Sequence, residues 1–203
     1  GVYGPCRNQI VSEKTPEQPF GPYEQSKSLF DELLISTAAQ SALEYTIIRP
    51  SNVYGRGMSN KSLALIIRAI RFRVFFFIGR PGHSANYIHV DDVVQSLMLS
   101  ISNPKAANQI YIVSTHSSVE SMVSALSRGA GLRPPNLRIH LRLATLVATV
   151  CKYLSLPLLT RSRVDALTSS TTYCSAKIEA DLGWTVTVPI QEGMFDYAKS
   201  KHP

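Results

Sequence analysis

Residues 86–114 read NYIHVDDVVQSLMLSISNPKAANQIYIVS and contain three predicted elements. They are a short strand at 86–90, a helix from 91 to about 102, and a second strand at 109–114. Strands that alternate with helices along a chain are typical of a parallel sheet flanked by helices. This stretch therefore predicts an α/β fold.

The same alternation continues on both sides of this stretch. The other predicted elements are helices at 26–39, 60–72, 118–129, 141–154, 175–182 and 190–199, and strands at 44–50 and 74–79. The strand at 74–79 reads VFFFIG, and such an apolar run predicts burial on both faces. Gly129 and Gly131 are expected to cap the C-terminus of the helix at 118–129. After residue 135 the pattern becomes mainly helical.

Composition limits the classes of function. The chain has 203 residues, of which 44% are hydrophobic and 17% charged, enough for one ordinary domain with a core or slightly more. The net charge of +7 comes from scattered lysines and arginines, and aromatic residues are not interleaved with them in any RNA-binding pattern. This pattern suits an anionic ligand and argues against nucleic-acid binding. Cys6, Cys151 and Cys174 match no metal-ligand spacing, so we expect no metal site and a reducing, cytoplasmic setting.

One apolar stretch could contact a membrane. Residues 143–159 read LATLVATVCKYLSLPLL, but Lys152 interrupts the stretch and Pro157 follows. A spanning helix needs about 20 consecutive, mostly apolar residues. We therefore expect a buried or surface-packed helix and no membrane association. Attachment of one face of this helix to a membrane stays open as the alternative.

The motif PYEQSK at 22–27 places Tyr23 and Lys27 four residues apart. On a helix, residues at this spacing lie on the same face. A cation close to a phenol favours the phenolate, so a tyrosine placed in this way can give and take protons near neutral pH. The alternative is a tyrosine and a lysine that merely open an amphipathic helix.

Six motifs in a fixed order connect the chain to a known family. They are GVYG (1–4), EKTPEQP (13–19), PYEQSK (22–27), IIRPSNVYGRG (47–57), NYIHVDDV (86–93) and KIEADLGW (177–184). In this order they resemble the extended short-chain dehydrogenase/reductase superfamily. Within it, they look most like the NAD-dependent epimerase/dehydratase family that acts on nucleotide sugars.

The resemblance implies a fold and an activity. The fold would be the second half of a Rossmann-type parallel sheet at 1–130, with a smaller, mainly helical substrate-binding region at 131–203 that is partly interleaved with the sheet. The protein would be an NAD(P)-dependent epimerase, dehydratase or 4-reductase that acts on a nucleotide sugar by hydride transfer, using NAD or NADP. A homodimer of the full-length protein is compatible with the resemblance. The alternatives are a steroid- or flavonol-reductase-like reductase of non-sugar ketones and a non-catalytic NAD(P)-binding scaffold.

The resemblance also assigns roles in catalysis and cofactor binding. Tyr23 would be the acid/base residue. Lys27 would hold the nicotinamide ribose and tune the phenol, so that both side chains contact the cofactor. Pro50 would line the nicotinamide pocket through its backbone. His89 is expected to be structural. Asp91 and Asp92 are expected to cap their helix or complement its positive N-terminal end, and to tie the strand end to neighbouring loops; the alternative is a catalytic carboxylate pair.

Three residues are candidates for binding the substrate. Asn52 would donate a hydrogen bond to the substrate diphosphate, and the alternative is a turn residue. Arg161 and Arg163 lie where relatives place an arginine on the diphosphate, and either could instead be a surface charge. Many relatives have Arg-Asp at the positions of Ala85 and Asn86, and this departure favours the non-sugar reductase branch.

Two family features are absent from the 203 residues. None of the eleven glycines forms the glycine-rich fingerprint that binds the dinucleotide pyrophosphate, and the family's catalytic Ser or Thr would fall before Gly1. We therefore expect this chain to be the C-terminal part of a longer enzyme that has on the order of 100 further residues. Alone, the chain is expected to be inactive.

Overall fold

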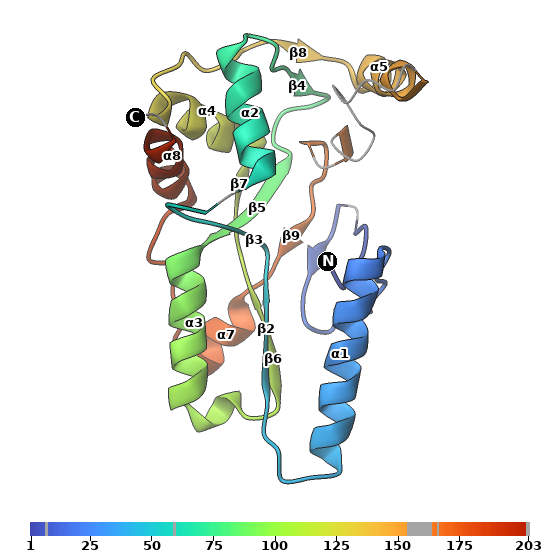
Figure 1. Ribbon diagram of the computed structural model, residues 1–203, viewed down its shortest axis with the longest axis vertical. Helices are drawn as coiled ribbons and strands as arrows, with labels where there is room; N and C mark the ends of the chain where they lie inside the picture. The colour runs from blue at the N-terminus through green and yellow to red at the C-terminus, as the bar shows by residue number, and fades with distance from the viewer. Residues whose placement is uncertain (7, 59, 154–163, 166, 202–203) are drawn as a thin grey trace. The chain divides into compact units, whose positions relative to one another are not determined.

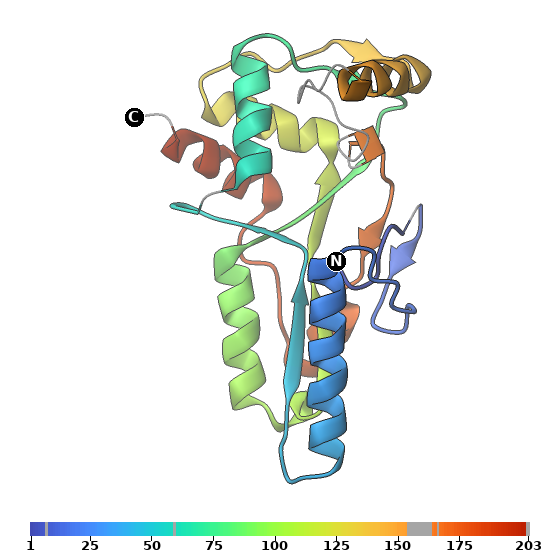
Figure 2. The same ribbon diagram turned by 45° about the vertical axis from the view of Figure 1, so that its right-hand side comes forward.

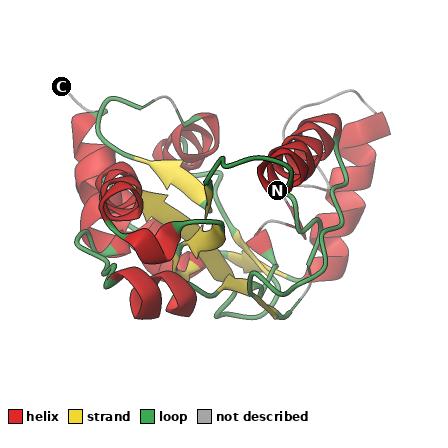
Figure 3. Ribbon diagram, turned by 90° about the horizontal axis from the view of Figure 1, so that it is seen from below, coloured by secondary structure: helices red, strands yellow, loops and turns green. Residues whose placement is uncertain are grey.

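The computed structural model describes residues 1–6, 8–58, 60–153, 164–165 and 167–201, and it describes 150–153 by their backbone alone. The chain forms two compact units. Unit 1 consists of Gly1–Val53, Asn86–Thr115 and Thr171–Val188, and unit 2 consists of Tyr54–Ala85, His116–Ser170 and Pro189–Pro203. Parallel strand pairs with neighbouring helices confirm the predicted α/β class (Figure 3).

Unit 1 is built around a parallel pair of strands. Strands β2 (Thr46–Pro50) and β6 (Gln109–Val113) pair in the register Thr46↔Gln109 to Pro50↔Val113. Helices α1 (Pro22–Ala39) and α3 (Val90–Ser102) lie on opposite sides of this pair (Figures 1 and 2). The other elements of the unit are β1 (Ile10–Val11), the 3-10 helix η1 (Pro104–Ala106), β9 (Thr172–Tyr173) and α7 (Ala176–Leu182), and β1 pairs with β9 in parallel.

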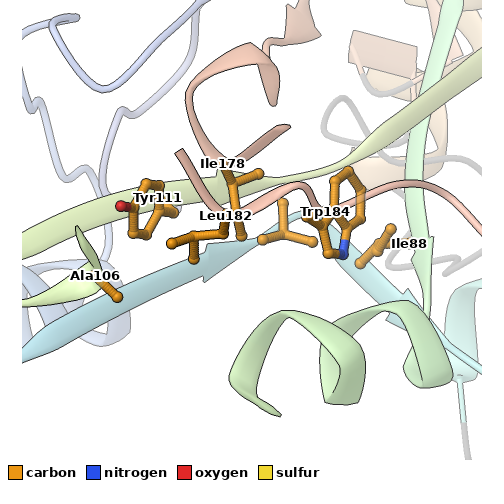
Figure 4. Close-up of a cluster of buried hydrophobic side chains, with 7 residues drawn as sticks. Ile88, Ala106, Tyr111, Ile178, Leu182 and Trp184 are labelled. Carbon is orange, nitrogen blue, oxygen red and sulfur yellow. The ribbon is translucent and has the colours of Figure 1, made fainter. Parts of the chain in front are cut away.

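The core of unit 1 joins the motif at 177–184 to β6. Figure 4 shows its side chains, and the cluster contains Ile88, Ala106, Tyr111, Val113, Ile178, Leu182 and Trp184. The indole nitrogen of Trp184, which is fully buried, donates to the Asp92 backbone oxygen at 3.0 Å. The motif therefore forms part of the core, and its aromatic residue fixes the first turn of α3.

The start of α3 corrects one expectation. His89, rather than either aspartate, is the N-cap residue, because its ring nitrogen accepts from the Asp91 backbone N–H at 3.3 Å. The two aspartates lie in the first turn, where negative charge complements the helix dipole. Asp92 is fully buried and accepts from the backbone N–H (2.8 Å) and the hydroxyl (2.6 Å) of Thr187, so it ties a distant loop to the helix as predicted.

Unit 2 contains most of the remaining helices. Its elements are α2 (Lys61–Arg71), β4 (Phe77–Ile78), α4 (Val119–Gly129), β8 (Arg138–Ile139), α5 (Leu141–Tyr153) and α8 (Ile190–Ser200). The chain passes between the units within β3 (Asn52–Tyr54), β5 (Ser84–His89) and β7 (Thr115–Ser118), which form a sheet of order β3-β5-β7. No helix of the described residues is long and apolar enough to cross a bilayer.

The predicted strand at 74–79 is shorter in the structure. Only Phe77 and Ile78 pair, in parallel with Arg138 and Ile139 of β8. Both paired residues are buried, as expected, but Val74 is 63% exposed. Pairing stops where the partner strand ends, and residues 74–76 form a loop in which Phe75 is still buried.

Gly129 was expected to cap α4 and instead lies in its last turn. The C-cap residue is Ala130, and Gly131 follows with a φ of 67°, the left-handed conformation typical of a helix end. A Cβ atom at Gly129 would collide with the backbone oxygen of Phe195 in α8. Glycine at this position therefore allows α4 and α8 to approach closely.

This contact predicts an unusual stability effect. Alanine normally stabilises a helix relative to glycine, but Gly129→Ala should lower the free energy of unfolding by about 1–3 kcal/mol because the two backbones must separate. Ser124→Ala on the same helix is the control and should change stability by less than about 0.5 kcal/mol. Urea unfolding of both variants tests this, and a more stable Gly129→Ala chain would show that the close approach is not needed.

Candidate active site

Helix α1 carries both members of the predicted acid/base pair. It begins at Pro22, four residues earlier than expected, because an extended Gly21 at the N-cap is followed by a proline whose fixed φ suits the first helical position. Tyr23 and Lys27 therefore lie on successive turns of one helix. The Lys27 ammonium nitrogen lies 5.5 Å from the centroid of the Tyr23 ring. The structure thus brings the two side chains together.

The functional groups of this pair are available to a ligand. Tyr23 is 69% exposed and Lys27 is also exposed. Within the described part of the chain, no side chain hydrogen-bonds the Tyr23 hydroxyl or pairs with the Lys27 ammonium. A phenol and an ammonium on one accessible helix face can move a proton and hold a polar ligand group at the same place.

A buried arginine lies behind this helix. Arg49 of β2 has a side chain that is only 10% exposed. Its guanidinium donates to Asp31 of α1 at 2.8 and 3.2 Å, to Glu17 at 2.5 Å, and to the Tyr3 hydroxyl at 3.0 Å. It also lies over the Tyr3 ring, 5.2 Å from the centroid. Two carboxylates and a phenol therefore satisfy one buried cation.

The hydrogen bonds of this network keep the Arg49 guanidinium charged. Burial alone would lower the pKa of the Arg49 guanidinium, but its hydrogen bonds to Tyr3, Glu17 and Asp31 outweigh burial and raise the pKa. Burial raises the pKa of the Tyr3 hydroxyl despite the neighbouring arginine, so this hydroxyl stays neutral at physiological pH and accepts from Arg49. The cation is thus permanent.

The network fixes α1 against the segment at 13–19. Ser28, the only described residue of α1 that is buried, donates its hydroxyl to Glu17 at 2.6 Å. Glu13 accepts from the Ile112 backbone N–H of β6 at 2.9 Å. Ser28 follows Lys27 directly, so the contact that anchors the helix lies beside the candidate pair.

The GVYG motif packs on the same segment. The Gln18 backbone N–H donates to the Val2 oxygen at 3.0 Å. Gly4 has a φ of 67°, and a Cβ there would collide with the Gln18 backbone oxygen. Only glycine fits both constraints, which explains its place in the motif.

Two of the remaining candidate residues lie at the end of β2 and the start of β3, and the other two lie in a segment that the structure does not describe. Pro50 is the last residue of β2 and is exposed. Asn52 begins β3 rather than a turn, is exposed, and donates its amide to the Asn86 backbone oxygen at 3.2 Å. Arg161 and Arg163 lie outside the described residues. No cluster of potential metal ligands occurs among the residues that were placed.

Sequence reasoning missed the Arg49 network. One signal was available: Arg49 lies in the predicted strand at 44–50, directly after the β-branched run at 46–48. A charge in a buried strand requires a partner. Nothing in the sequence, however, identifies Glu17 and Asp31 as the partners among the chain's 14 acidic residues.

Comparison with known proteins identifies the family. The sequence profile described as "NAD dependent epimerase/dehydratase family" matches residues 1–114, more than half of the chain. The chain belongs to the NAD-dependent epimerase/dehydratase family. Its members use a nicotinamide cofactor, which agrees with the predicted NAD or NADP.

Individual relatives are distant. The chain is 28% identical over 213 residues to a 3beta-hydroxysteroid-dehydrogenase/decarboxylase isoform 1 of Arabidopsis thaliana, covering 96% of this chain and 48% of the relative. It is 26% identical over 196 residues to a UDP-glucose 4-epimerase of Vibrio cholerae, covering 96% and 57%. The chain thus spans about half the length of these curated relatives.

Solved structures confirm the Rossmann-type fold. A UDP-glucuronic acid 4-epimerase from Bacillus cereus in complex with NAD matches with a TM-score of 0.72 at 16% identity, covering 100% of this chain and 60% of that one. MoeE5 in complex with UDP-glucuronic acid and NAD matches with a TM-score of 0.71 at 24% identity, covering 98% and 61%. At these identities the likeness concerns the fold alone.

Breaking the Arg49 network is expected to lower the free energy of unfolding strongly. Arg49→Met should lower the free energy of unfolding by about 3 kcal/mol, because it leaves two poorly solvated carboxylates without their cation. Arg128→Met, an exposed arginine of α4, is the control and should have an effect below about 0.5 kcal/mol. Urea unfolding measures both.

A rescue variant separates lost charge pairing from lost packing. Adding Glu17→Gln and Asp31→Asn to Arg49→Met removes the unpaired charges, so part of the stability should return. If the triple variant were less stable than Arg49→Met by the sum of the losses that Glu17→Gln and Asp31→Asn each cause in the wild type, the network would not be coupled.

Proposed function

We propose that the chain carries the proton-transfer site of an NAD(P)-dependent epimerase, dehydratase or 4-reductase that acts on a nucleotide sugar. The observation that carries the proposal is the exposed Tyr23–Lys27 pair, 5.5 Å from ring centroid to ammonium, on a helix held by the buried Arg49 network. Family membership supports it, because members act with a nicotinamide cofactor.

The chain's own residues divide the work. Tyr23 transfers the proton of the substrate hydroxyl through its phenol oxygen, and Lys27 favours the phenolate and holds the nicotinamide ribose. Pro50 contributes backbone to the nicotinamide pocket, and Asn52 donates to the substrate diphosphate. Bound NAD or NADP supplies the acceptor or donor of the hydride. Arg161 and Arg163 stay candidates for the diphosphate.

The residues present fit the cofactor only in part. The accessible phenol and ammonium suit the nicotinamide end. In contrast, no glycine of the sequence lies in a fingerprint for the pyrophosphate. The 203 residues therefore hold one end of the dinucleotide, and we propose that turnover requires the further polypeptide that would supply the other end.

A reductase of non-sugar ketones is the second candidate. Ala85 is 7% exposed and presents only a methyl group, and the Asn86 amide donates to the Thr171 backbone oxygen at 2.8 Å. Neither residue therefore offers a cation to a diphosphate. The relative named for a 3beta-hydroxysteroid points the same way. A non-catalytic scaffold is disfavoured, because a binding module needs no phenol next to a free ammonium.

The first test separates catalysis from binding in a form of the enzyme that includes the glycine-rich segment. Tyr23→Phe should lower kcat by about 10²–10⁴-fold with nearly unchanged cofactor affinity, because the phenol acts only in proton transfer. Lys27→Ala should weaken both. Gln25→Ala, exposed on the same helix, is the control and should change neither. Near-normal turnover by Tyr23→Phe would exclude Tyr23 as the acid/base residue.

The second test distinguishes the substrate classes. If the substrate is a nucleotide sugar, UDP or dTDP should compete with it, and Asn52→Ala should raise KM by the equivalent of about 1–3 kcal/mol. Inhibition assays with a panel of nucleoside diphosphates measure this. If none of them inhibits, the ketone reductase is the correct branch.

The third test concerns the 203-residue chain alone. It should not bind NAD or NADP measurably, because the pyrophosphate has no glycine-rich loop to contact. Calorimetric titration with each dinucleotide measures affinity directly, and a thermal melt with and without cofactor is the cross-check. A micromolar affinity would show that this chain builds a complete dinucleotide site by other means.

A further inference from the structure

The two units differ strongly in charge. Unit 2 contains 15 lysine and arginine residues against 4 aspartate and glutamate residues, a net charge of +11. Unit 1 contains 6 against 10, a net charge of −4. The modest +7 of the whole chain therefore hides a strongly basic unit beside an acidic one.

The basic excess is larger than a small substrate needs. A nucleoside diphosphate carries about two to three negative charges, and one or two arginines satisfy them through bidentate hydrogen bonds. Arg138 of unit 2 pairs with Glu120 at 2.6 Å, and this pair uses one of the 15 cations. The remaining charge points to an extended anionic partner.

In helix α5 of this unit, small side chains are buried and large apolar side chains are exposed. Its buried residues are the small Ala144 and Ala148, which pack with Ile78 of β4 in the unit's buried cluster. Leu143 and Leu146 are 50% and 60% exposed instead. A helix that only covers a core places its large apolar residues inward. The outward leucines therefore have a use outside the core.

More apolar and basic residues gather near α5. Val74 is 63% and Leu137 58% exposed, and the Leu137 backbone oxygen accepts from Phe77 of β4 at 2.8 Å. Within unit 2, the C-terminal end of α2, the β4–β8 pair and α5 lie at the same end in both views (Figures 1 and 2). We define the apolar–basic end as the exposed residues Arg73, Val74, Leu137, Arg142, Leu143 and Leu146.

We infer that the apolar–basic end of unit 2 binds the surface of an anionic lipid bilayer. Exposed leucines enter the boundary between headgroups and acyl chains, and arginines contact the lipid phosphates. The 13 described residues of α5 are too few to span a bilayer, so in this arrangement they lie along its surface. This inference adopts the alternative that the sequence left open for residues 143–159 and reverses the expectation of no membrane association.

Other partners fit these features less well. A second copy of the same end would bring two units of net charge +11 together, and like charges oppose such a contact. A nucleic acid would use the arginines but would leave the outward leucines exposed to water. Of these three partners, the anionic bilayer is the one that uses both sets of residues.

Vesicle flotation of the purified chain tests the inference, because aggregated protein sinks whereas vesicle-bound protein floats. Vesicles of phosphatidylcholine with about 30% phosphatidylserine should bind the chain at about 0.1 M salt. Pure phosphatidylcholine should bind it at least tenfold more weakly, and high salt should reduce binding to the anionic vesicles. A chain that does not float with anionic vesicles overturns the inference.

Two double variants assign the binding to the proposed residues. Leu143→Ser with Leu146→Ser should weaken partitioning at least tenfold through lost apolar burial. Arg73→Gln with Arg142→Gln should weaken it about 25-fold, or roughly fivefold per arginine. Leu29→Ser with Leu33→Ser, an exposed leucine pair on α1 of unit 1, is the matched control and should bind as the wild type does.

Circular dichroism and gel filtration accompany each variant. Unchanged flotation of both double variants would overturn the inference, because the bilayer would then contact another surface. If the leucine variant instead dissociated a dimer that has no affinity for vesicles, the leucines would serve a second copy. Tight, salt-sensitive binding of a labelled DNA duplex without vesicle binding would assign the basic unit to a nucleic acid.

Discussion

The buried guanidinium of Arg49 is the constraint on which the candidate site depends. Burial of a cation costs several kcal/mol unless anions accompany it. Strand β2 can therefore keep Arg49 only if α1 delivers Asp31 and the segment at 13–19 delivers Glu17. The same segment is joined to β6 through Glu13. Arg49, Glu17 and Asp31 thus connect β2, the segment at 13–19 and α1, the helix that carries Tyr23 and Lys27.

The two units differ in how their charged groups are paired and in which apolar residues are exposed. In unit 1 two carboxylates pair with Arg49, while the phenol of Tyr23 and the ammonium of Lys27, the proposed proton-transfer pair, are exposed. In unit 2 the cations are in excess and the large apolar residues of α5 face outward. The first arrangement suits a reacting ligand, whereas the second suits an extended anionic surface. A proton-transfer site and an interfacial attachment site are therefore compatible within one chain.

Periodicity and motifs predicted the α/β class, the order of the long helices and the meeting of Tyr23 with Lys27. Strands β1, β8 and β9 have only two residues each, and so short an element shows no alternation, whereas β4 was predicted but too long. Gly129 was misplaced because the close approach of α8 is a tertiary contact. Arg49 was missed because its partners are 18 and 32 residues away. The roles of Pro50, Asn52, Arg161 and Arg163 stay predictions.

The central claim is that the ammonium of Lys27 acts on the phenol of Tyr23 during proton transfer. The most direct measurement is kcat in the enzyme form that includes the glycine-rich segment, for the wild type and for Lys27→Gln at saturating cofactor and substrate. Tyr23→Phe and the double variant, measured alongside, complete a double-mutant cycle on kcat. If the two groups act in one step, the double variant should lose hardly more activity than Tyr23→Phe alone, because the effects of coupled residues do not add. Losses that multiply would contradict the claim and would leave Lys27 as a cofactor-binding residue alone.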